Sequence, residues 1–309
     1  MRIMVTGGTG FIGRPLCAAL SQEGHRVTLL TRRKEEAQRS CGSTVTAVEW
    51  NGREAGAWKH CLEDADAVIN LAGAPIVDGR WTDAYKRLLM ESRVLTTRLL
   101  VEALSRCSSK PRTLISASGI GYYGASDDRV LDEGAARGQG FLADLCLAWE
   151  AEARRAAELG LRVVLLRTGM VLEEDGGALP KMLLPFRFFA GGPIMPGTQW
   201  VSWIHRHDHI GLIQWLLKTP SVSGPVNAVA PEVVTMNQFC QALGQVLHRP
   251  SWLPVPGFAL QLALGELGKL MTTGQRVTPA KALSGGYIFH YPTLEPALRA
   301  ILAKEYRRV

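Results

Sequence analysis

The feature that most constrains this chain is a glycine-rich turn between a short apolar run and a helix-like segment. Ile3-Met4-Val5 is short enough for a buried strand, and the residues from Arg14 to Leu20 have the pattern of a helix. Four glycines lie between them, and three of these, Gly7, Gly10 and Gly13, are evenly spaced. A strand, a glycine turn and a helix in this order predict a dinucleotide-binding fingerprint.

Each glycine of this turn meets a different steric need. Gly7 permits the tight turn, Gly10 lets the backbone approach a pyrophosphate, and Gly13 lets the helix lie close to the strand. The first helical N–H groups then face an anion at the positive end of the helix dipole. The spacing is GxxGxxG rather than GxGxxG, and a purely structural turn is the alternative. We predict cofactor contacts along the turn, at Gly7, Thr9, Gly10, Phe11, Ile12 and Gly13.

The end of the second predicted strand, from Arg26 to Thr31, indicates which dinucleotide is bound. NAD-preferring sites place Asp or Glu here, but this chain has Arg32 and Arg33 after Thr31. An acid would repel a 2′-phosphate, whereas a guanidinium binds one through two charge-assisted hydrogen bonds. The pair therefore predicts NADP(H), with Arg32 as the main contact and Arg33 as support. A solvated pair at a strand end is the alternative.

Further strands alternate with helices through the first half of the chain. We expect strands at about 44–48, 67–71, 112–116 and 162–167, which predicts an α/β fold with a Rossmann-type, doubly wound parallel sheet. The fourth strand runs to Leu71 and ends at Ala72-Gly73. These small residues leave room for a cofactor at the carboxyl edge of the sheet, where such folds bind ligands.

The residues from Trp81 to Cys107 read as one long helix. Its expected buried stripe consists of leucines at steps of three and four: Leu88, Leu89, Leu95, Leu99, Leu100 and Leu104. Arg93 falls away from that stripe. It is either a surface charge or a side chain that turns toward the cofactor phosphates.

The alternation ends after about residue 174, where glycine, proline and aromatic residues become dense. We expect a cofactor domain at 1–173 and a smaller C-terminal α/β domain at 174–309, on the substrate side of the sheet, with about 204–230 returning to the first domain. Helices are expected at 208–217, 236–247, 258–271 and 293–303. The aromatic residues either wall a substrate pocket or form the core of the smaller domain, and the second reading is the simpler one.

Composition excludes several classes of function. Hydrophobic residues make up 47% of the chain, charged residues 20%, and the net charge is +7. The basic residues are spread along the sequence, so we expect no nucleic-acid binding. No run of about 18 apolar residues predicts a membrane span. The N-terminus has no leader pattern, so we expect a cytoplasmic protein.

Histidine and cysteine give little support for a metal site. The six cysteines are scattered without a CxxC pair. His205, His207 and His209 flank Asp208, and this run fits either a metal site or a loop that enters a helix capped by Asp208. We expect the second, and no metal.

Many segments together resemble one family. They are Thr6 to Gly13, Asn70 to Ile76, Arg80-Trp81, Ser92-Arg93, Tyr122 to Gly124, Trp149-Glu150, Arg167 to Leu172, Met182 to Arg187, Gly191 to Ile194 and Trp203 to His205. The chain resembles the extended short-chain dehydrogenases/reductases, in particular the atypical branch called epimerase family proteins, some of which are named cell-division inhibitors.

This resemblance implies a place for each end of the cofactor. NADP(H) would lie across Gly7 to Gly13, Arg32, Leu71-Ala72 and Arg93, with its nicotinamide end near Ser118 and Val171. By analogy of fold, the substrate would be a nucleotide sugar or another carbonyl compound. Both a monomer and a homodimer are compatible with the sequence.

The chain departs from the family in its catalytic residues. Active members use Ser or Thr with Tyr and Lys, the last two four apart on one helix face, so that the lysine lowers the pKa of the tyrosine. None of the six tyrosines here is followed by lysine at that offset. The helix that should carry the pair offers neither residue between Asp144 and Glu150. Ser118 keeps the serine position, with Ser116 as a substitute.

Two functions remain open. In the first, the protein is an NADP(H)-dependent oxidoreductase or epimerase with a rearranged proton relay, and we predict Ser118, Tyr123 and His205 as its catalytic residues, with Tyr122 as the alternative phenol. In the second, it is a non-catalytic, NADP(H)-dependent regulatory or binding protein, for example one linked to cell division. The missing tyrosine and lysine favour the second function, whereas the polar groups retained around the pocket favour the first.

Overall fold

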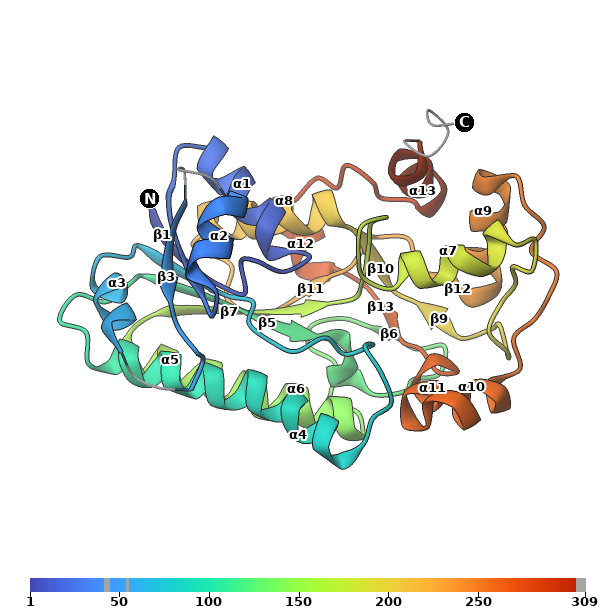
Figure 1. Cartoon of the computed structure of the whole chain (residues 1–309), viewed down its shortest axis with the longest axis horizontal. Coiled ribbons are helices and arrows are strands. Elements are labelled where there is room, and N and C mark those ends of the chain that lie inside the picture. The colour runs from blue at the N-terminus through green and yellow to red at the C-terminus, as the bar shows by residue number, and fades with distance from the viewer. Residues whose placement is uncertain (42–44, 54–55, 304–309) are drawn as a thin grey trace.

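The computed structural model describes residues 1–41, 45–53 and 56–303. Its centre is a seven-stranded sheet in the order β11-β7-β5-β4-β1-β2-β3, in which all neighbouring strands are parallel (Figure 1). The strands are β1 (Arg2–Thr6), β2 (Arg26–Thr31), β3 (Val45–Glu49), β4 (Ala67–Asn70), β5 (Thr113–Gly119), β7 (Arg162–Thr168) and β11 (Gly224–Ala228). The predicted Rossmann-type, doubly wound class is confirmed. Thr44, expected in the third strand, lies outside the described residues.

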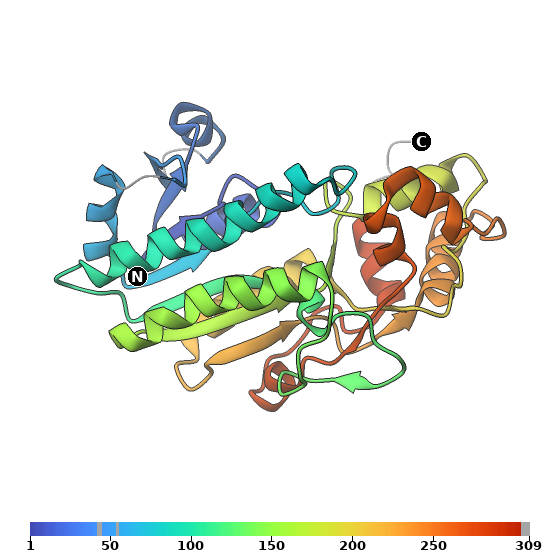
Figure 2. The ribbon, with the colours of Figure 1, turned by 90° about the horizontal axis from the view of Figure 1, so that it is seen from below.

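Helices cover both faces of this sheet. α1 (Gly13–Gln22) and α8 (Arg206–Lys218) lie on one face, while α5 (Thr96–Ser105) and α6 (Phe141–Arg154) run side by side over the other (Figure 2). Successive residues of β1 point into opposite cores: Ile3 and Val5 pack with α1 and α8, and Met4 packs with α5 and α6. Burial on both faces explains why the central strands read as continuous apolar runs.

A second core lies beyond the carboxyl edge of the sheet. It is built around Phe186, Trp203 and Phe239, from α7 (Leu179–Arg187), α9 (Met236–Leu247) and α13 (Leu294–Leu302). Short strand pairs accompany it: β8 (Met170–Leu172) with β10 (Trp203–His205), β9 (Trp200–Val201) with β12 (Val234–Thr235), and β6 (Val130–Leu131) with β13 (Arg276–Val277). Strand β11 and helix α8 follow residue 174 in the chain but belong to the large sheet and its cover. Shorter helices are α2 (Lys34–Cys41), η2 (Ala57–Lys59), α3 (His60–Glu63), η4 (Ile120–Tyr123), η5 (Arg155–Leu159) and α12 (Ala280–Ser284).

The long helix expected at 81–107 is interrupted. It consists of α4 (Asp83–Met90), a π-helical turn η3 (Glu91–Leu95) and α5. A π turn closes i→i+5 hydrogen bonds and therefore shifts the phase of the helix. This is why the predicted stripe was wrong at Leu88 and Leu95, which are exposed, although Leu89, Leu100 and Leu104 are buried. The same turn carries Arg93 inward, so it is not a surface charge.

The helix expected at 258–271 is also divided. α10 (Gly257–Leu264) ends at Gly265, whose φ of +62° starts a new direction, and α11 (Glu266–Met271) follows. In the part of the chain that the structure describes, no helix combines the length and the apolar character needed to cross a bilayer.

Candidate functional site

The glycine turn is held against the end of β4 with no space for side chains. Gly7 has a φ of +68°, and a Cβ on it would lie 2.7 Å from the carbonyl carbon of Leu71. A Cβ on Gly13 would lie 2.2 Å from the Gly7 oxygen, so the first turn of α1 touches the turn itself. Gly10 N–H donates to this same Gly7 oxygen at 3.1 Å. The backbone of the turn after β1 therefore contacts both the backbone after β4 and the backbone at the start of α1.

The start of α1 is left open. Its N-cap residue, Ile12, has a side chain that cannot accept a hydrogen bond, and no capping bond is formed there. Thr9 and Gly10 are exposed, whereas Phe11 is covered by Gly176 and by the guanidinium of Arg206, whose Cζ lies 5.1 Å from its ring. Uncapped N–H groups at the positive end of a helix form an anion-binding site.

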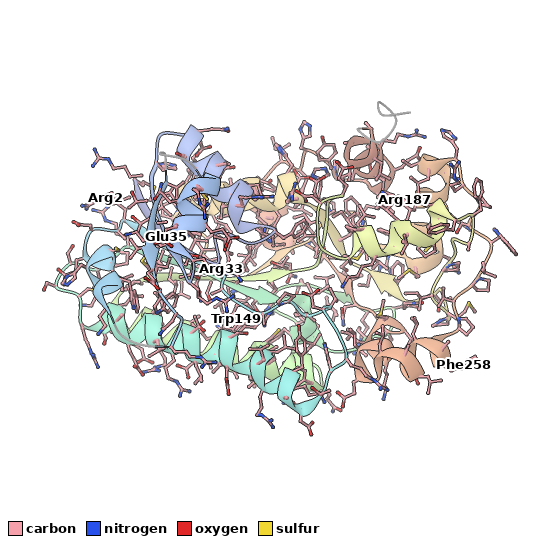
Figure 3. The ribbon with its side chains drawn as sticks, viewed as in Figure 1. Arg2, Arg33, Glu35, Trp149, Arg187 and Phe258 are labelled. Carbon is pink, nitrogen blue, oxygen red and sulfur yellow. The ribbon has the colours of Figure 1, made fainter. Side chains whose placement is uncertain are left out.

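Arg32 and Arg33 follow β2, and both side chains are exposed. Arg33, labelled in Figure 3, is tied back: its N–H donates to Thr31 Oγ1 at 3.2 Å, and its Nη1 pairs with Glu36 at 3.1 Å. Within the described part of the chain, no side chain pairs with Arg32. Of the two guanidinium groups, Arg32 has the greater freedom to meet a ligand.

Arg93 is buried beneath the loop that follows β4. Its Nη2 donates to Ala74 O at 2.7 Å, and its Cζ lies 5.3 Å from the ring of Trp149, which Figure 3 labels. A Cβ on Gly73 would lie 3.0 Å from this guanidinium. Its buried Nε has no hydrogen-bond partner among the described residues. Burial lowers the pKa of Arg93. The side chain shapes the loop and keeps one donor unused.

A ladder of hydrogen bonds supports this edge from below, and the sequence did not reveal it. Thr6 Oγ1 donates to Asn70 Oδ1 at 2.7 Å and accepts from Ala72 N–H at 3.2 Å. Asn70 Nδ2 donates to Thr97 Oγ1 at 2.9 Å and to Ser116 Oγ at 3.3 Å. Ser116 is thus a buried member of this ladder, which fixes the position of Ala72.

A second polar row crosses β5, β7 and β11 at one level, since Ser118 is in register with Arg167 and Arg167 with Asn227. Arg167 binds Glu150 of α6 through two hydrogen bonds, Nε to Oε1 at 2.8 Å and Nη2 to Oε2 at 3.0 Å. The two side chains are only 2% and 1% exposed. Ser118 donates its hydroxyl to Glu150 Oε1 at 2.8 Å. Burial alone would lower the pKa of Arg167, but the bonds and the charge of Glu150 outweigh it and raise the pKa.

The predicted catalytic tyrosine, Tyr123, belongs to this row. Its hydroxyl accepts from Arg167 Nη1 at 3.0 Å and donates to Asn227 Oδ1 at 2.8 Å. Burial raises the pKa of Tyr123, although Arg167 opposes this. Tyr122 is half-buried, and its ring centre lies 3.5 Å from the Cζ of Arg167. The Arg167 guanidinium thus lies against both tyrosine rings. The Tyr123 hydroxyl already has two hydrogen-bond partners, whereas Tyr122 is only half-buried.

Cys146 and Glu150 lie four residues apart on α6, the offset of the missing tyrosine and lysine. Glu150 binds Ser118, and Cys146 Sγ lies 3.6 Å from the carbonyl oxygen of Gly119. Burial raises the pKa of Cys146 to about 11, so the thiol stays protonated at neutral pH. A neutral thiol and a carboxylate thus face the serine where a phenol and an ammonium were expected. The one sequence signal for this difference from the family was Arg167, a charged residue directly after the apolar run of β7.

His205 lies apart from this row, at the start of α8. Its Nδ1 accepts from His207 N–H at 2.9 Å and caps the helix, while its ring stacks on Tyr291 with centres 4.1 Å apart. Burial first, and then the neighbouring His207, Arg206 and His290, lower the pKa of His205 to about 4. The imidazole is therefore neutral and carries its proton on Nε2, and the lone pair that a general base needs is used by the helix.

The expectation that Asp208 caps α8 was wrong, because His205 performs that task. The buried Asp208 carboxylate instead accepts from His290 N–H and Tyr291 N–H, both at 2.8 Å. It ties the segment before α13 to the start of α8. His209 is buried and meets Thr168 Oγ1 at 3.0 Å. Among the described residues, no group of His, Cys, Asp and Glu is arranged to hold a metal ion.

Comparison with known proteins places this chain in a family. The model described as the NAD dependent epimerase/dehydratase family matches residues 3–229. The chain belongs to this family. A second model, a domain of unknown function called DUF1731, matches residues 255–301. The resemblance seen in the sequence is confirmed.

Relatives match over nearly the whole chain. It is 42% identical to the epimerase family protein SDR39U1 homolog, chloroplastic, of Arabidopsis thaliana, over 98% of this chain and 87% of the relative. It is 41% identical to the epimerase family protein YfhF of Bacillus subtilis, over 98% of both chains. The crystal structure of human epimerase family protein SDR39U1 with NADPH is 34% identical, with a TM-score of 0.88, over 98% of this chain and 99% of that one.

The buried ion pair generates a prediction about stability. We expect Glu150→Leu to lower the free energy of unfolding by about 3 kcal/mol or more, because it leaves the Arg167 charge buried without its partner. Glu150→Leu with Arg167→Met should cost less than Glu150→Leu alone, because no charge is then stranded. Urea unfolding measures both. Arg154→Ala, which removes only the half-exposed partner of Glu150, is the control and should cost about 1 kcal/mol or less. Equal losses for Glu150→Leu and the double variant would contradict the prediction.

The buried histidines generate a prediction about pH. The pKa values of His205 and His209 are both lowered to about 4 from 6.5 by burial. Between these values the unfolded chain binds more protons than the folded one, so stability is present above pH 6.5 and is lost as the pH falls. The expected slope is about 1.4 kcal/mol per pH unit for each histidine. His209→Gln should reduce the slope by that amount in urea titrations between neutral pH and pH 5, and an unchanged slope would contradict the prediction.

Proposed function

We propose that this protein binds NADP(H) across the carboxyl edge of its sheet, and that this is its principal function. The observation that carries the proposal is the uncapped start of α1, held against the Gly7 turn and the end of β4. There the pyrophosphate would meet N–H groups that have no side-chain partner. Thr9, Phe11 and Ile12 supply the rest of this phosphate site.

The ends of β4 and β5 offer the continuation of the cofactor site. Leu71, Ala72 and Gly73 would contact the adenine side and the pyrophosphate, above the Asn70 ladder that fixes their backbone. Arg93 would add its unused Nε donor beneath Gly73. The nicotinamide would lie toward Ser118 and Val171, and the human relative solved with NADPH, 34% identical, supports this choice of cofactor.

Preference for the 2′-phosphate rests on Arg32. Its side chain is exposed at the end of β2, where an NAD-specific site would carry a carboxylate. Arg33 would support it less, because Glu36 already holds its guanidinium.

At the nicotinamide end, the polar row favours cofactor binding without the usual proton relay. The hydroxyls of Ser118 and Tyr123 are both held by the buried Glu150–Arg167 pair and its neighbours. Neither group exchanges a proton with a substrate unless this row is broken, which would expose buried charge. We therefore place a regulatory or binding protein that holds NADP(H), for example in cell division, ahead of an enzyme. A cytoplasmic location remains part of this proposal, although one relative is named as chloroplastic.

A second candidate is an NADP(H)-dependent oxidoreductase or epimerase acting on a nucleotide sugar or another carbonyl compound. Tyr122 favours it, because this phenol lies half-exposed on the face of the Arg167 guanidinium. In that case Tyr122 would meet the substrate, with Tyr123 and Ser118 as positioning residues. His205 would contribute through its Nε2–H as a donor, since its Nδ1 caps α8.

Cofactor preference can be tested directly. We expect Arg32→Ala to weaken NADPH binding by roughly 10- to 100-fold, the value of a lost charge-assisted contact, and to leave NADH binding almost unchanged. Isothermal titration calorimetry of wild type and variant with both cofactors measures this. Arg33→Ala is the matched control and should have a smaller effect. Equal losses for NADPH and NADH would refute the 2′-phosphate contact.

Turnover distinguishes the two candidates. We expect NADPH to bind tightly but to show no saturable oxidation with a panel of aldehydes, ketones and nucleotide sugars. If oxidation is seen and Tyr122→Phe abolishes it while Tyr123→Phe preserves kcat, the enzyme reading replaces the binding one. NADPH absorbance follows the reaction, and calorimetry confirms that each variant still binds the cofactor.

A further inference from the structure

The loop between β4 and α4, residues 71–82, is held by side chains at four successive backbone carbonyl groups. We call this segment the gate loop. The four hydrogen bonds run from Arg93 Nη2 to Ala74 O at 2.7 Å, from Tyr85 Oη to Pro75 O at 2.5 Å, from Trp81 Nε1 to Ile76 O at 2.9 Å and from Lys181 Nζ to Val77 O at 2.7 Å. The gate loop therefore has a defined path, although it forms neither helix nor strand.

Three of these donors belong to the same part of the molecule as the gate loop, and the fourth does not. Trp81, Tyr85 and Arg93 follow in the chain, in or beside α4 and η3. Lys181 lies on α7, whose buried residues belong to the second core. Its Nζ is also 3.5 Å from Asp78 Oδ1, and both side chains are more than half exposed. Lys181 thus bridges two parts of the molecule with one flexible side chain.

Two more contacts bridge the same two parts. Arg80 Nη2 donates to Leu262 O of α10 at 3.1 Å, and Lys86 Nζ pairs with Glu266 of α11 at 2.5 Å. Figure 1 shows the path of the gate loop, which runs from the sheet toward α7 and then turns beside α11 to reach α4. Arg80 and Glu266 are exposed. Exposed polar contacts contribute little free energy each, so these bridges can break and re-form without unfolding either part.

The apolar contacts of the gate loop lie on one side only. Ala74 and Ile76 pack in the cluster around Leu89 and Trp149, which α4 and α6 supply. The second core, as far as the structure describes it, includes no residue of the gate loop. Apolar burial therefore holds the loop to α4 and α6, and the three polar bridges hold it to α7, α10 and α11.

Near the end of β7, by contrast, the two parts are joined through strands. The parallel pair of β8 and β10 places Val171 and Ile204 in the core beneath α1 and α8, and Leu172 and Trp203 in the second core. Packed interiors resist sliding, so neither strand can shift without disturbing both cores. Segments with exposed hydrogen bonds and little apolar burial open first. The bridged side is therefore the side that can open.

We propose that the three bridges form a latch, which closes the gate loop over bound NADP(H) and sets the rate at which the cofactor enters and leaves. This inference rests on the proposed function, in which Leu71, Ala72 and Gly73 at the start of the same loop contact the cofactor. Release of a ligand held by a closed loop waits for the loop to open.

The latch contacts join protein to protein, so they are the same with and without the cofactor. A contact that is equal in both states does not change the binding equilibrium. Loss of the latch therefore raises the association and dissociation rates together and leaves Kd almost unchanged. A side chain that contacts the cofactor directly would change the dissociation rate and Kd instead.

Stopped-flow fluorescence of NADPH with the full-length protein tests the latch. We expect the double variant Lys181→Ala/Arg80→Ala to raise both rates by roughly 10-fold, the combined loss of two exposed contacts. Kd should stay within about twofold. Lys269→Ala is the matched control, because Lys269 is an exposed lysine of α11 outside the latch. It should leave both rates unchanged.

A charge exchange tests the bridge between α4 and α11 by itself. We expect Glu266→Lys to raise both rates, because it sets two ammonium groups against each other. Adding Lys86→Glu to the same chain should restore the slow rates, because the ion pair then forms again with its charges exchanged. Rates that stay high in this double variant would contradict the latch.

Trp81 reports on the gate loop without the cofactor, since its indole N–H is bonded to Ile76 O. In protein that contains fluorotryptophan, the fluorine NMR signal of Trp81, assigned with Trp81→Phe, should shift or broaden in Lys181→Ala and stay unchanged in Lys269→Ala. Unchanged rates at normal NADPH affinity, or a rise in the dissociation rate alone, overturns the proposal. A wild-type protein without affinity for NADPH would instead remove the proposed function, and the Trp81 signal would still show whether Lys181 closes the loop.

Discussion

The buried pair of Glu150 and Arg167 is the interaction around which the carboxyl ends of β5, β7 and β11 are organised. Arg167 closes β7, Glu150 stands on α6, and the hydroxyls of Ser118 and Tyr123 are fixed to them. A charge pair with so little exposure is stable only if every donor and acceptor is matched. That requirement aligns β5, β7 and β11 with α6 and gives the carboxyl edge its rigidity.

The part of the carboxyl edge near Gly7 and the part near Ser118 therefore differ in character. Near Gly7 and Gly13, backbone groups are packed together and no side chain caps the start of α1. Near Ser118, the polar side chains already satisfy one another. The glycine turn and the polar row depend on different strands, so one can keep its form while the other changes.

The sequence revealed the features that depend on local pattern. Periodicity and spacing were enough to predict the glycine turn, the alternation of strands with helices and the position of the two arginines after β2. It missed features that depend on residues far apart in the chain, such as the contact of Ser118 with Glu150 or of Tyr123 with Asn227. The π turn in the long helix changed which leucines are buried, and no local rule indicated it. His205 replaced Asp208 as a cap because His290 and Tyr291 occupy the carboxylate.

The spacing of Cys146 and Glu150 has a consequence for engineering. A graft of the usual tyrosine and lysine onto α6 uses these two positions, but a lysine at 150 alone would bring an ammonium against the guanidinium of Arg167 in a site closed to water. Such a graft must also replace Arg167, which in turn releases Tyr123 and Asn227. Introducing that pair is therefore a concerted redesign of at least three positions, and single substitutions pass through destabilised intermediates.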